Sequence, residues 1–286
     1  PATMAGEGPV LETISSIVAD DFFGAIEITS IKDDAVRAQV ADLLASSGMI
    51  VGYGAQPIQL MNKLDVNSLD EEKRQAAITR LKQAIDEAYA LGASKFALLS
   101  GPYPGPDQHA AAMQQLIKSL HELCAYAESK GTMPLVLEVF DREIDKKSLI
   151  GPTVEAVEIS AAVRREHPTF GLMLDLSHLP LQFETSQHAL TTAKDHITHI
   201  HIGNCVVKDK SHPLYGDLHP RFGIPGGENG VAELTEFLSV LREIGYIGEG
   251  KQNVVGFEVR PHGKDTSLGV IANAKRTLLE AWARLS

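Results

Sequence analysis

The segments FGLMLDL at 170–176 and HITHIHI at 196–202 are two short apolar runs, separated by residues 177–195. Runs of this kind are typical of strands that are buried on both faces, and the intervening stretch is long enough for a helical crossover between parallel strands. The same alternation continues in both directions along the chain. We therefore expect further strands at 24–29, 49–53, 95–100, 134–139 and 254–259.

Amphipathic stretches lie between these strands, and we expect helices at 33–47, 70–92, 107–130, 153–166, 229–244 and 266–284. Strands that alternate with helices predict an α/β fold with a parallel sheet, here a (β/α)₈ TIM barrel. Only seven strands are recognisable, and the helix-like segment 10–22 precedes the first of them. Either the first strand is missing from this sequence, or the irregular first ten residues take its place. The alternative fold is an open doubly wound sheet.

Composition restricts the class of protein. The chain has 286 residues, of which 44% are hydrophobic, and no linker-like stretch interrupts it, so we expect a single domain over 1–286. A net charge of -11 repels a phosphate backbone, which argues against nucleic acid as a partner. No apolar run approaches the roughly 20 residues that cross a bilayer, and the amino terminus lacks the features of a signal peptide. With only two cysteines, we expect a cytoplasmic protein without a membrane partner.

Acids and a histidine lie near the carboxyl ends of four consecutive predicted strands, and active sites of barrels are built at that end. These residues are Glu138, Asp175, His201 and Glu258. Any one of them alone is more often a helix cap or a salt-bridge partner. Three carboxylates that converge on one barrel mouth repel one another unless a cation lies between them. We therefore predict a divalent metal site, with Mn²⁺ preferred and Mg²⁺, Co²⁺ or Zn²⁺ as alternatives.

The segments LEVFDRE, MLDLSHLPLQFE, HIHIGNC and FEVRP resemble the xylose isomerase-like TIM-barrel superfamily. Within it, they are similar to the sugar isomerase/epimerase branch, which includes ketose 3-epimerases and hydroxypyruvate isomerases, and the similarity spans nearly the whole chain. The resemblance implies that Glu138, Asp175, His201 and Glu258 hold the metal. It also implies that His178, three residues after Asp175, contacts the substrate.

The chain departs from that branch after His201. Asn204 replaces a Glu that the branch often has, and two valines stand where ketose epimerases carry an arginine that holds the sugar. A longer loop follows, so we expect substrate contacts from Asn204, His219, Arg221 and Arg260. Asp217-Leu-His219 is similar to the Asp-x-His that endonuclease IV uses for an additional zinc, but the two early histidine ligands of that enzyme have no counterpart here.

The predicted chemistry is proton abstraction next to a carbonyl of a small sugar or keto-acid, since a metal at this site stabilises the developing enediolate. Glu138 and Glu258 are the predicted base and acid. Isomerisation or epimerisation is the expected outcome. A keto-sugar lyase, including one that cleaves C-glycosides of 3-oxo sugars, is the alternative. The remaining rivals are an endonuclease IV-like nuclease and a non-catalytic sugar-binding module.

We also expect a homodimer or homotetramer. The helical segments ITRLKQAIDEAYALGA and AAAMQQLIKSLHELCAYAESKG are predicted to leave partly apolar faces on the surface of a monomer. Members of the superfamily that the chain resembles are commonly oligomeric, and closed symmetry is the rule for such assemblies.

Overall fold

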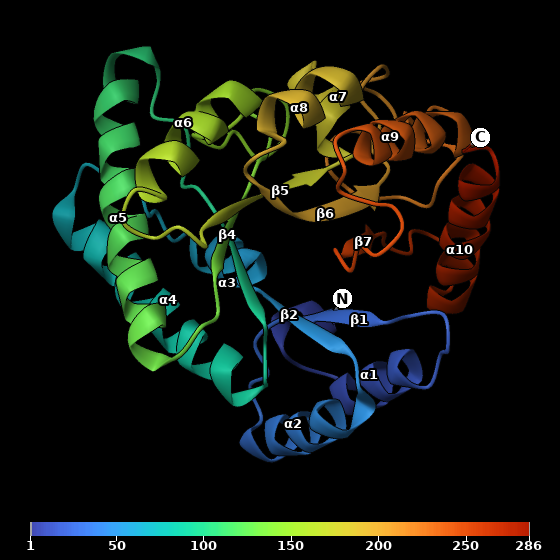
Figure 1. The fold of residues 1–286 in the computed structure, drawn as a ribbon, viewed down its shortest axis with the longest axis horizontal. Coiled ribbons are helices and arrows are strands. Elements are labelled where there is room, and N and C mark those ends of the chain that lie inside the picture. The colour runs from blue at the N-terminus through green and yellow to red at the C-terminus, as the bar shows by residue number, and fades with distance from the viewer. Residues whose placement is uncertain (1, 286) are drawn as a thin grey trace. The chain divides into compact units, whose positions relative to one another are not determined.

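The structure is a computed structural model that describes residues 2–285. Its seven strands follow one another in the sheet in chain order, from β1 to β7 (Figure 1). The strand pairs β1 and β2, β2 and β3, β5 and β6, and β6 and β7 are all parallel. A doubly wound sheet reverses its strand order where its two halves meet, whereas a TIM barrel keeps chain order. The TIM-barrel prediction is confirmed, and the doubly wound alternative is wrong.

The chain forms two compact units. Unit 1 contains the residues up to Leu137 together with Ile159–Gly171, and unit 2 contains Glu138–Glu158 together with the residues from Leu172 onward. The boundary passes through strand β4, so Glu138, the last residue of that strand, belongs to unit 2.

Unit 1 holds the first half of the alternation. Its elements are η1 (Ala2–Ala5), α1 (Val10–Val18), β1 (Ala25–Ile28), α2 (Asp34–Ser47), β2 (Ile50–Gly54), α3 (Gln56–Asn62), α4 (Glu71–Ala90), β3 (Lys95–Leu99), η2 (Pro106–Gln108), α5 (His109–Lys130) and most of β4 (Leu135–Glu138). No strand precedes β1 in the part of the chain that the structure describes. The expectation of a missing first strand is therefore confirmed, because the first described residues are helical.

Helices α4 and α5 pack against each other in unit 1 (Figure 1). Helix α4 begins after Asp70, whose carboxylate accepts hydrogen bonds from the first free backbone N–H groups of the helix. The fully buried guanidinium of Arg74 joins the two helices. It forms ion pairs with Glu71 of α4 and Glu122 of α5, and donates a hydrogen bond of 2.9 Å to Ser119 Oγ.

Unit 2 holds the second half. Its elements are α6 (Thr153–Val163), which extends into unit 1, and then β5 (Gly171–Asp175), α7 (His178–Gln182), α8 (Ser186–Ala193), β6 (Ile197–Gly203), α9 (Val231–Glu243), β7 (Val255–Glu258) and α10 (Ser267–Ala283). The apolar positions of β5 are buried throughout, as expected for a strand with both faces covered. The short helices α7 and α8 were not predicted, because neither is long enough to show a helical period.

The surface helices of the described residues differ in their exposed apolar side chains. Neither α4 nor α5, for which partly apolar faces were expected, carries an exposed large hydrophobic side chain among residues 2–285. The exposed apolar side chains of unit 2 lie instead mainly on α10, at Leu268, Leu279 and Trp282. No helix in the described part of the chain combines the length and the apolar character that crossing a membrane requires.

Candidate active site

Four side chains of unit 2, each from one of four successive strands, come together. Glu138, Asp175 and Glu258 are the last residues of β4, β5 and β7, and His201 lies on β6 opposite Asp175 in the strand register. Each offers one oxygen or nitrogen atom, and these four atoms all lie within 4.8 Å of one another. Because parallel strands present their carboxyl ends at one edge, residues that are 120 positions apart (138 to 258) meet at one point.

Asp175 lies at the centre of this group and is fully buried. Its Oδ1 accepts a hydrogen bond of 2.6 Å from the backbone N–H of Ser177, while Oδ2 has no hydrogen-bond partner among the described residues. Burial raises the pKa of Asp175 to about 6. A buried carboxylate oxygen without a partner costs free energy unless it binds a cation.

His201 connects two of the acids. Its Nδ1 lies 2.8 Å from Glu258 Oε2 and 3.7 Å from Glu138 Oε1. Burial raises the pKa of Glu258, but the neighbouring rings of His219 and His201 outweigh that effect and lower the pKa to about 2. Glu258 is therefore an anion at neutral pH. The neighbouring histidines compensate its charge.

The four residues fit a divalent cation. Three carboxylates and one imidazole form a donor set that suits Mn²⁺, Mg²⁺, Co²⁺ or Zn²⁺. The buried Oδ2 of Asp175 lacks a hydrogen-bond partner in the described chain, which is the state expected of an oxygen that belongs to a metal. The four metal ligands predicted from the sequence are thus brought together in one unit.

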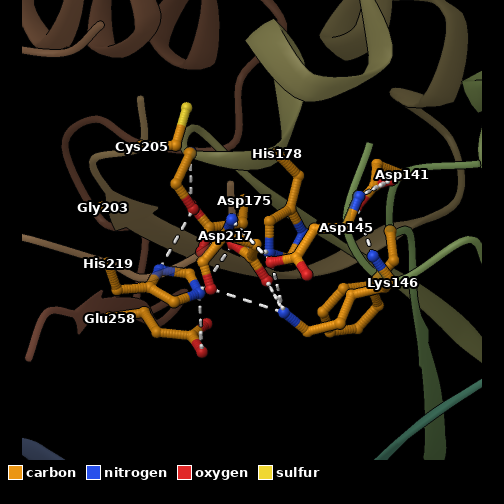
Figure 2. Close-up of polar contacts among 12 residues, drawn as sticks. Asp141, Asp145, Lys146, Asp175, His178, Gly203, Cys205, Asp217, His219 and Glu258 are labelled. Carbon is orange, nitrogen blue, oxygen red and sulfur yellow. Dashed lines mark hydrogen bonds and ion pairs between the residues drawn. The ribbon is translucent and has the colours of Figure 1, made fainter. Parts of the chain in front are cut away.

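A second polar group adjoins the first and centres on Asp217, which is almost fully buried (Figure 2). Asp217 Oδ1 lies 2.9 Å from His219 Nε2 and 3.3 Å from His178 Nε2. The same nitrogen of His219 lies 3.3 Å from Glu258 Oε1, so the two groups share a carboxylate. Asp175, His178, His219 and Glu258 also bring ligand atoms within 4.8 Å of one another.

Both histidines of this group are held in orientation through their other nitrogens. His178 Nδ1 donates to the carbonyl of Val139 at 2.9 Å, and His219 Nδ1 lies 3.3 Å from Ser177 Oγ. Burial disfavours the charged rings, but the carboxylate of Asp217 outweighs burial. The pKa of His178 therefore lies well above its ordinary value, and that of His219 rises to about 9. These two rings in turn hold the pKa of Asp217 well below its ordinary value against the effect of burial.

Lys146 is a member of the site that sequence reasoning missed. It follows β4 in a loop organised by buried Asp141, whose carboxylate accepts hydrogen bonds from the backbone N–H groups of residues 144, 145 and 146. Lys146 Nζ lies 2.8 Å from Asp217 Oδ2 and 3.3 Å from Asp145 Oδ2 (Figure 2). The signal in the sequence was the charged run after Glu138, but a charged run usually indicates a solvated loop.

The model of the xylose isomerase-like TIM-barrel family matches residues 18–280, which is most of the chain. The chain belongs to this family. The match covers all seven strands and every residue of the two polar groups described above.

Solved structures of similar fold include three epimerases. A D-psicose 3-epimerase from Clostridium cellulolyticum H10, solved with D-tagatose, has 19% identity and a TM-score of 0.65 over 97% of this chain and 92% of its own. An L-ribulose 3-epimerase has 18% identity and a TM-score of 0.69 over 98% and 92%. A 3-keto-D-glucoside 4-epimerase from E. coli, in its apo form, has 15% identity and a TM-score of 0.63 over 100% and 95%. At these identities, the likeness shows the fold.

Asn204 and Arg221 were predicted to contact the substrate. In the structure, the side chain of Asn204 and the backbone carbonyl of Arg221 form a contact that holds the loop 205–228. The amide of Asn204 is buried, and its Nδ2 donates to the carbonyl of Arg221 at 3.0 Å. Its Oδ1 accepts from the backbone N–H groups of Cys205 and Asn229. These are the contacts of a loop anchor, and a role of Asn204 in substrate binding stays a prediction.

The side chains of the two arginines, Arg221 and Arg260, are exposed to solvent. Arg221 is half exposed, and its Nε lies 3.3 Å from Asp265 Oδ1. Arg260 is exposed, and its backbone N–H donates to the carbonyl of His219 at 2.7 Å. That bond helps to hold His219 at a left-handed φ of 50°. Of the predicted substrate residues, the structure therefore brings His178 and His219 to the acidic cluster, and it ties the side chain of Arg221 to Asp265.

Proposed function

We propose that this chain is a divalent-metal-dependent isomerase or epimerase that acts on a sugar, a keto-sugar or a hydroxypyruvate-type substrate. The observation that carries the proposal is the convergence of Glu138, Asp175, His201 and Glu258 on one point, with a buried oxygen of Asp175 left without a hydrogen bond in the described chain. Three proteins of similar fold, a D-psicose 3-epimerase, an L-ribulose 3-epimerase and a 3-keto-D-glucoside 4-epimerase, support the same class of substrate.

The four residues would hold the cation, with Mn²⁺ as the preferred ion. When bound there, a divalent cation supplies positive charge beside the substrate oxygen on which negative charge develops. The chain supplies the remaining chemistry. Its carboxylates and imidazoles bind the substrate, orient it and move protons.

Glu138 and Glu258 are the proposed proton carriers. They come from strands β4 and β7, on either side of β5 and β6 in the sheet order, and both reach His201 Nδ1. One group, as the carboxylate, removes the proton from the carbon next to the substrate carbonyl. The other, as the protonated acid, gives its proton to the opposite face of that carbon, which forms an epimer, or to the neighbouring carbon, which forms an isomer; both groups then exchange protons with water to regain their starting forms.

The second polar group is proposed to bind substrate oxygens. Asp217 fixes His178 and His219, and the two rings line a site that is otherwise rich in carboxylates. Such rings suit hydroxyl and carbonyl oxygens of a small polar substrate. Lys146 keeps Asp217 in place and thereby positions both rings.

A keto-sugar lyase is the alternative within the same site. The base that removes a proton next to the carbonyl leaves electron density that can expel a group from the adjacent carbon, so the same residues serve β-elimination. Because a 3-keto-D-glucoside 4-epimerase has a similar fold, we include keto-glucosides among the substrates to test.

The test combines metal analysis with isotope exchange. Purified protein is analysed for bound metals, and then incubated in D₂O with hydroxypyruvate, a panel of ketoses and 3-keto-glucosides. Deuterium at the carbon next to the carbonyl, together with an isomer or epimer, supports the proposal, whereas an eliminated product supports the lyase. Sugar binding without exchange by the metal-loaded protein would instead identify a non-catalytic module, and cleavage of abasic DNA would identify a nuclease.

Variants of the proposed metal ligands test whether these residues bind the metal. Asp175→Asn and His201→Ala should each lower metal content and exchange together, because each removes a donor that the other three residues cannot replace. His188→Ala changes an exposed histidine of α8 and should change neither. Full metal content in both site variants would show that the metal lies elsewhere.

A further inference from the structure

A separate group of histidines and carboxylates lies entirely within unit 1 and shares no residue with the candidate active site. Helix α5 presents His121, Cys124 and Glu128 at positions i, i+3 and i+7, so these side chains lie along one face of the helix. The adjoining segment carries Glu166 and His167, just before strand β5 begins. Ligand atoms from His121, Glu166 and His167 all lie within 4.8 Å of one another.

The burial and the hydrogen bond of His167 suit a metal ligand. It is buried, and its Nδ1 lies 2.9 Å from Glu128 Oε1. A carboxylate at one ring nitrogen fixes the tautomer, since that nitrogen carries the proton and the other nitrogen, Nε2, keeps its lone pair. Carboxylates hold the histidine ligands of many metal sites in this way and raise their basicity. Glu128 therefore occupies the position of an outer carboxylate.

His121 lies beside it. The ring centroids of His121 and His167 are 5.2 Å apart, and His121 Nε2 is 3.9 Å from Glu166 Oε1. The other nitrogen of His121, Nδ1, is buried and has no hydrogen-bond partner within the described residues. Two imidazoles and one carboxylate thus face one another, with one buried nitrogen that the described residues leave unsatisfied.

We propose that His121, Glu166 and His167 form a second metal site, which binds Zn²⁺ or a similar borderline divalent ion with water in the remaining position. Two imidazoles with one carboxylate are a donor set for zinc, whereas the candidate active site, with three carboxylates and one imidazole, suits Mn²⁺ or Mg²⁺. The two sites therefore differ in the metal that each prefers. An open position on the ion is available because Glu166 is exposed to solvent.

Cys124 is excluded as a ligand although it lies on the same helix face. It is buried and lines a cavity of about 220 Å³ that also borders Glu128 and His167. The ligand atoms that lie within 4.8 Å of one another here come from His121, Glu166 and His167, and the Cys124 thiol is not among them. The site is therefore a nitrogen and oxygen site.

The proposed ion links two segments that are far apart in sequence. His121 lies in the middle of α5, and Glu166 with His167 forms the turn between α6 and β5. A metal that binds the folded protein and not the unfolded chain stabilises the fold in proportion to its affinity and concentration. The role assigned to this site is structural: within unit 1, it fastens α5 to the segment that follows α6.

The experiment measures zinc binding without reference to activity. Protein stripped with a chelator is dialysed against buffered Zn²⁺, and bound zinc is counted in the wild type, in Asp175→Asn/His201→Ala, in His121→Ala/His167→Ala and in the combination of all four substitutions. Two zinc ions in the wild type, one in either double variant and none in the combination are the expected result. His188→Ala, an exposed histidine outside both groups, is the matched control and should keep two.

Two further measurements distinguish a loss of zinc binding from misfolding of a variant. Far-UV circular dichroism establishes that each metal-free variant is folded, and Glu128→Gln, which leaves all three ligands in place, should weaken zinc binding at this site by about 10–100-fold. Zinc should raise the midpoint of thermal unfolding of Asp175→Asn/His201→Ala, and should not do so once His121 and His167 are also replaced. An Asp175→Asn/His201→Ala variant that binds no zinc, or equal zinc binding after the loss of both histidines, would overturn the proposal.

Discussion

Lys146 Nζ lies 2.8 Å from Asp217 Oδ2, within a loop that the carboxylate of Asp141 organises. The other oxygen of Asp217 faces both His178 and His219. A lysine from the loop after β4 therefore fixes the carboxylate that positions two histidines from later segments of unit 2. Lys146 is a positioning residue: it acts on the rings through Asp217.

Lys146→Met should impair substrate binding more than metal binding. The change leaves one oxygen of a buried carboxylate without its cation, which costs about 1–3 kcal/mol. We expect a lower free energy of unfolding in urea, a raised KM for the substrate and an unchanged metal content. Lys146→Arg, which keeps the charge, should restore most of the KM. Equal losses in the methionine and arginine variants would show that packing, and not charge, explains the effect.

Glu138→Gln and Glu258→Gln should each lower the rate of solvent-deuterium exchange by about 10²–10⁴, since an amide cannot take up a proton near neutral pH. Some metal should remain, because the amide oxygen still coordinates. The double variant should be little slower than the slower single variant, as residues that act as one unit are not additive. Metal content and exchange are measured on the same preparations. Normal exchange in both variants would transfer the role of base to another residue, such as His178 or His219.

Two variants test different roles: Asn204→Ala tests the residue that anchors the loop, and Arg221→Ala tests the proposed contact with the substrate. Asn204 makes three hydrogen bonds that hold residues 205, 221 and 229, so its loss should destabilise the protein by about 1–3 kcal/mol in urea unfolding. Arg221→Ala removes only an exposed ion pair and should leave stability within about 1 kcal/mol. If Arg221 contacts the substrate, kcat/KM falls while metal content stays constant. An unchanged kcat/KM for the true substrate would show that the arginine has no part in binding.

Stability in acid should depend on Glu71. Hydrogen bonds from Arg74 and Lys118 lower the pKa of Glu71 in the folded protein below its ordinary value of 4.5. A carboxyl with a lowered pKa in the folded state contributes stability above its unfolded pKa and loses that contribution as pH falls toward the folded value. Glu71→Gln should therefore flatten the decline of the thermal midpoint between pH 5 and about pH 3, relative to wild type. The neighbouring Glu72→Gln is the control, and identical pH profiles for wild type and Glu71→Gln would contradict the prediction.

A homodimer or homotetramer remains our proposal for the assembly, with α10 in the contact. Leu268, Leu279 and Trp282 are exposed on one face of that helix, at 76%, 58% and 53%. Light scattering should return a multiple of the 30.9 kDa chain mass, and Leu279→Ser/Trp282→Ser should lower it. A wild-type mass near that of a single chain at micromolar concentration would refute the proposal.

The sequence alone determined the strands and the family. Seven apolar runs punctuated by helical periods predicted all seven strands, because burial on both faces leaves a continuous hydrophobic signal that needs no knowledge of neighbours. Polar residues inside such runs are conspicuous for the same reason. Glu138, Asp175, His201 and Glu258 could therefore be named before their distances were known, and the structure brings them within 4.8 Å of one another.

Only the tertiary structure shows which residues the loop side chains contact. Lys146 and Asp217 lie in irregular segments, where no periodicity indicates which way a side chain points, and 71 positions separate them (146 to 217). Only the fold shows that one pairs with the other, that Asn204 holds its loop, and that Arg221 pairs with Asp265. The same holds for His121 and His167, which read as ordinary helix and turn residues until α5 and the turn before β5 bring their rings to 5.2 Å. The sequence pattern indicates which residues are buried and the periodicity of each helix or strand. Contacts between loops that are distant in the sequence form only when the folded sheet brings the ends of its strands together.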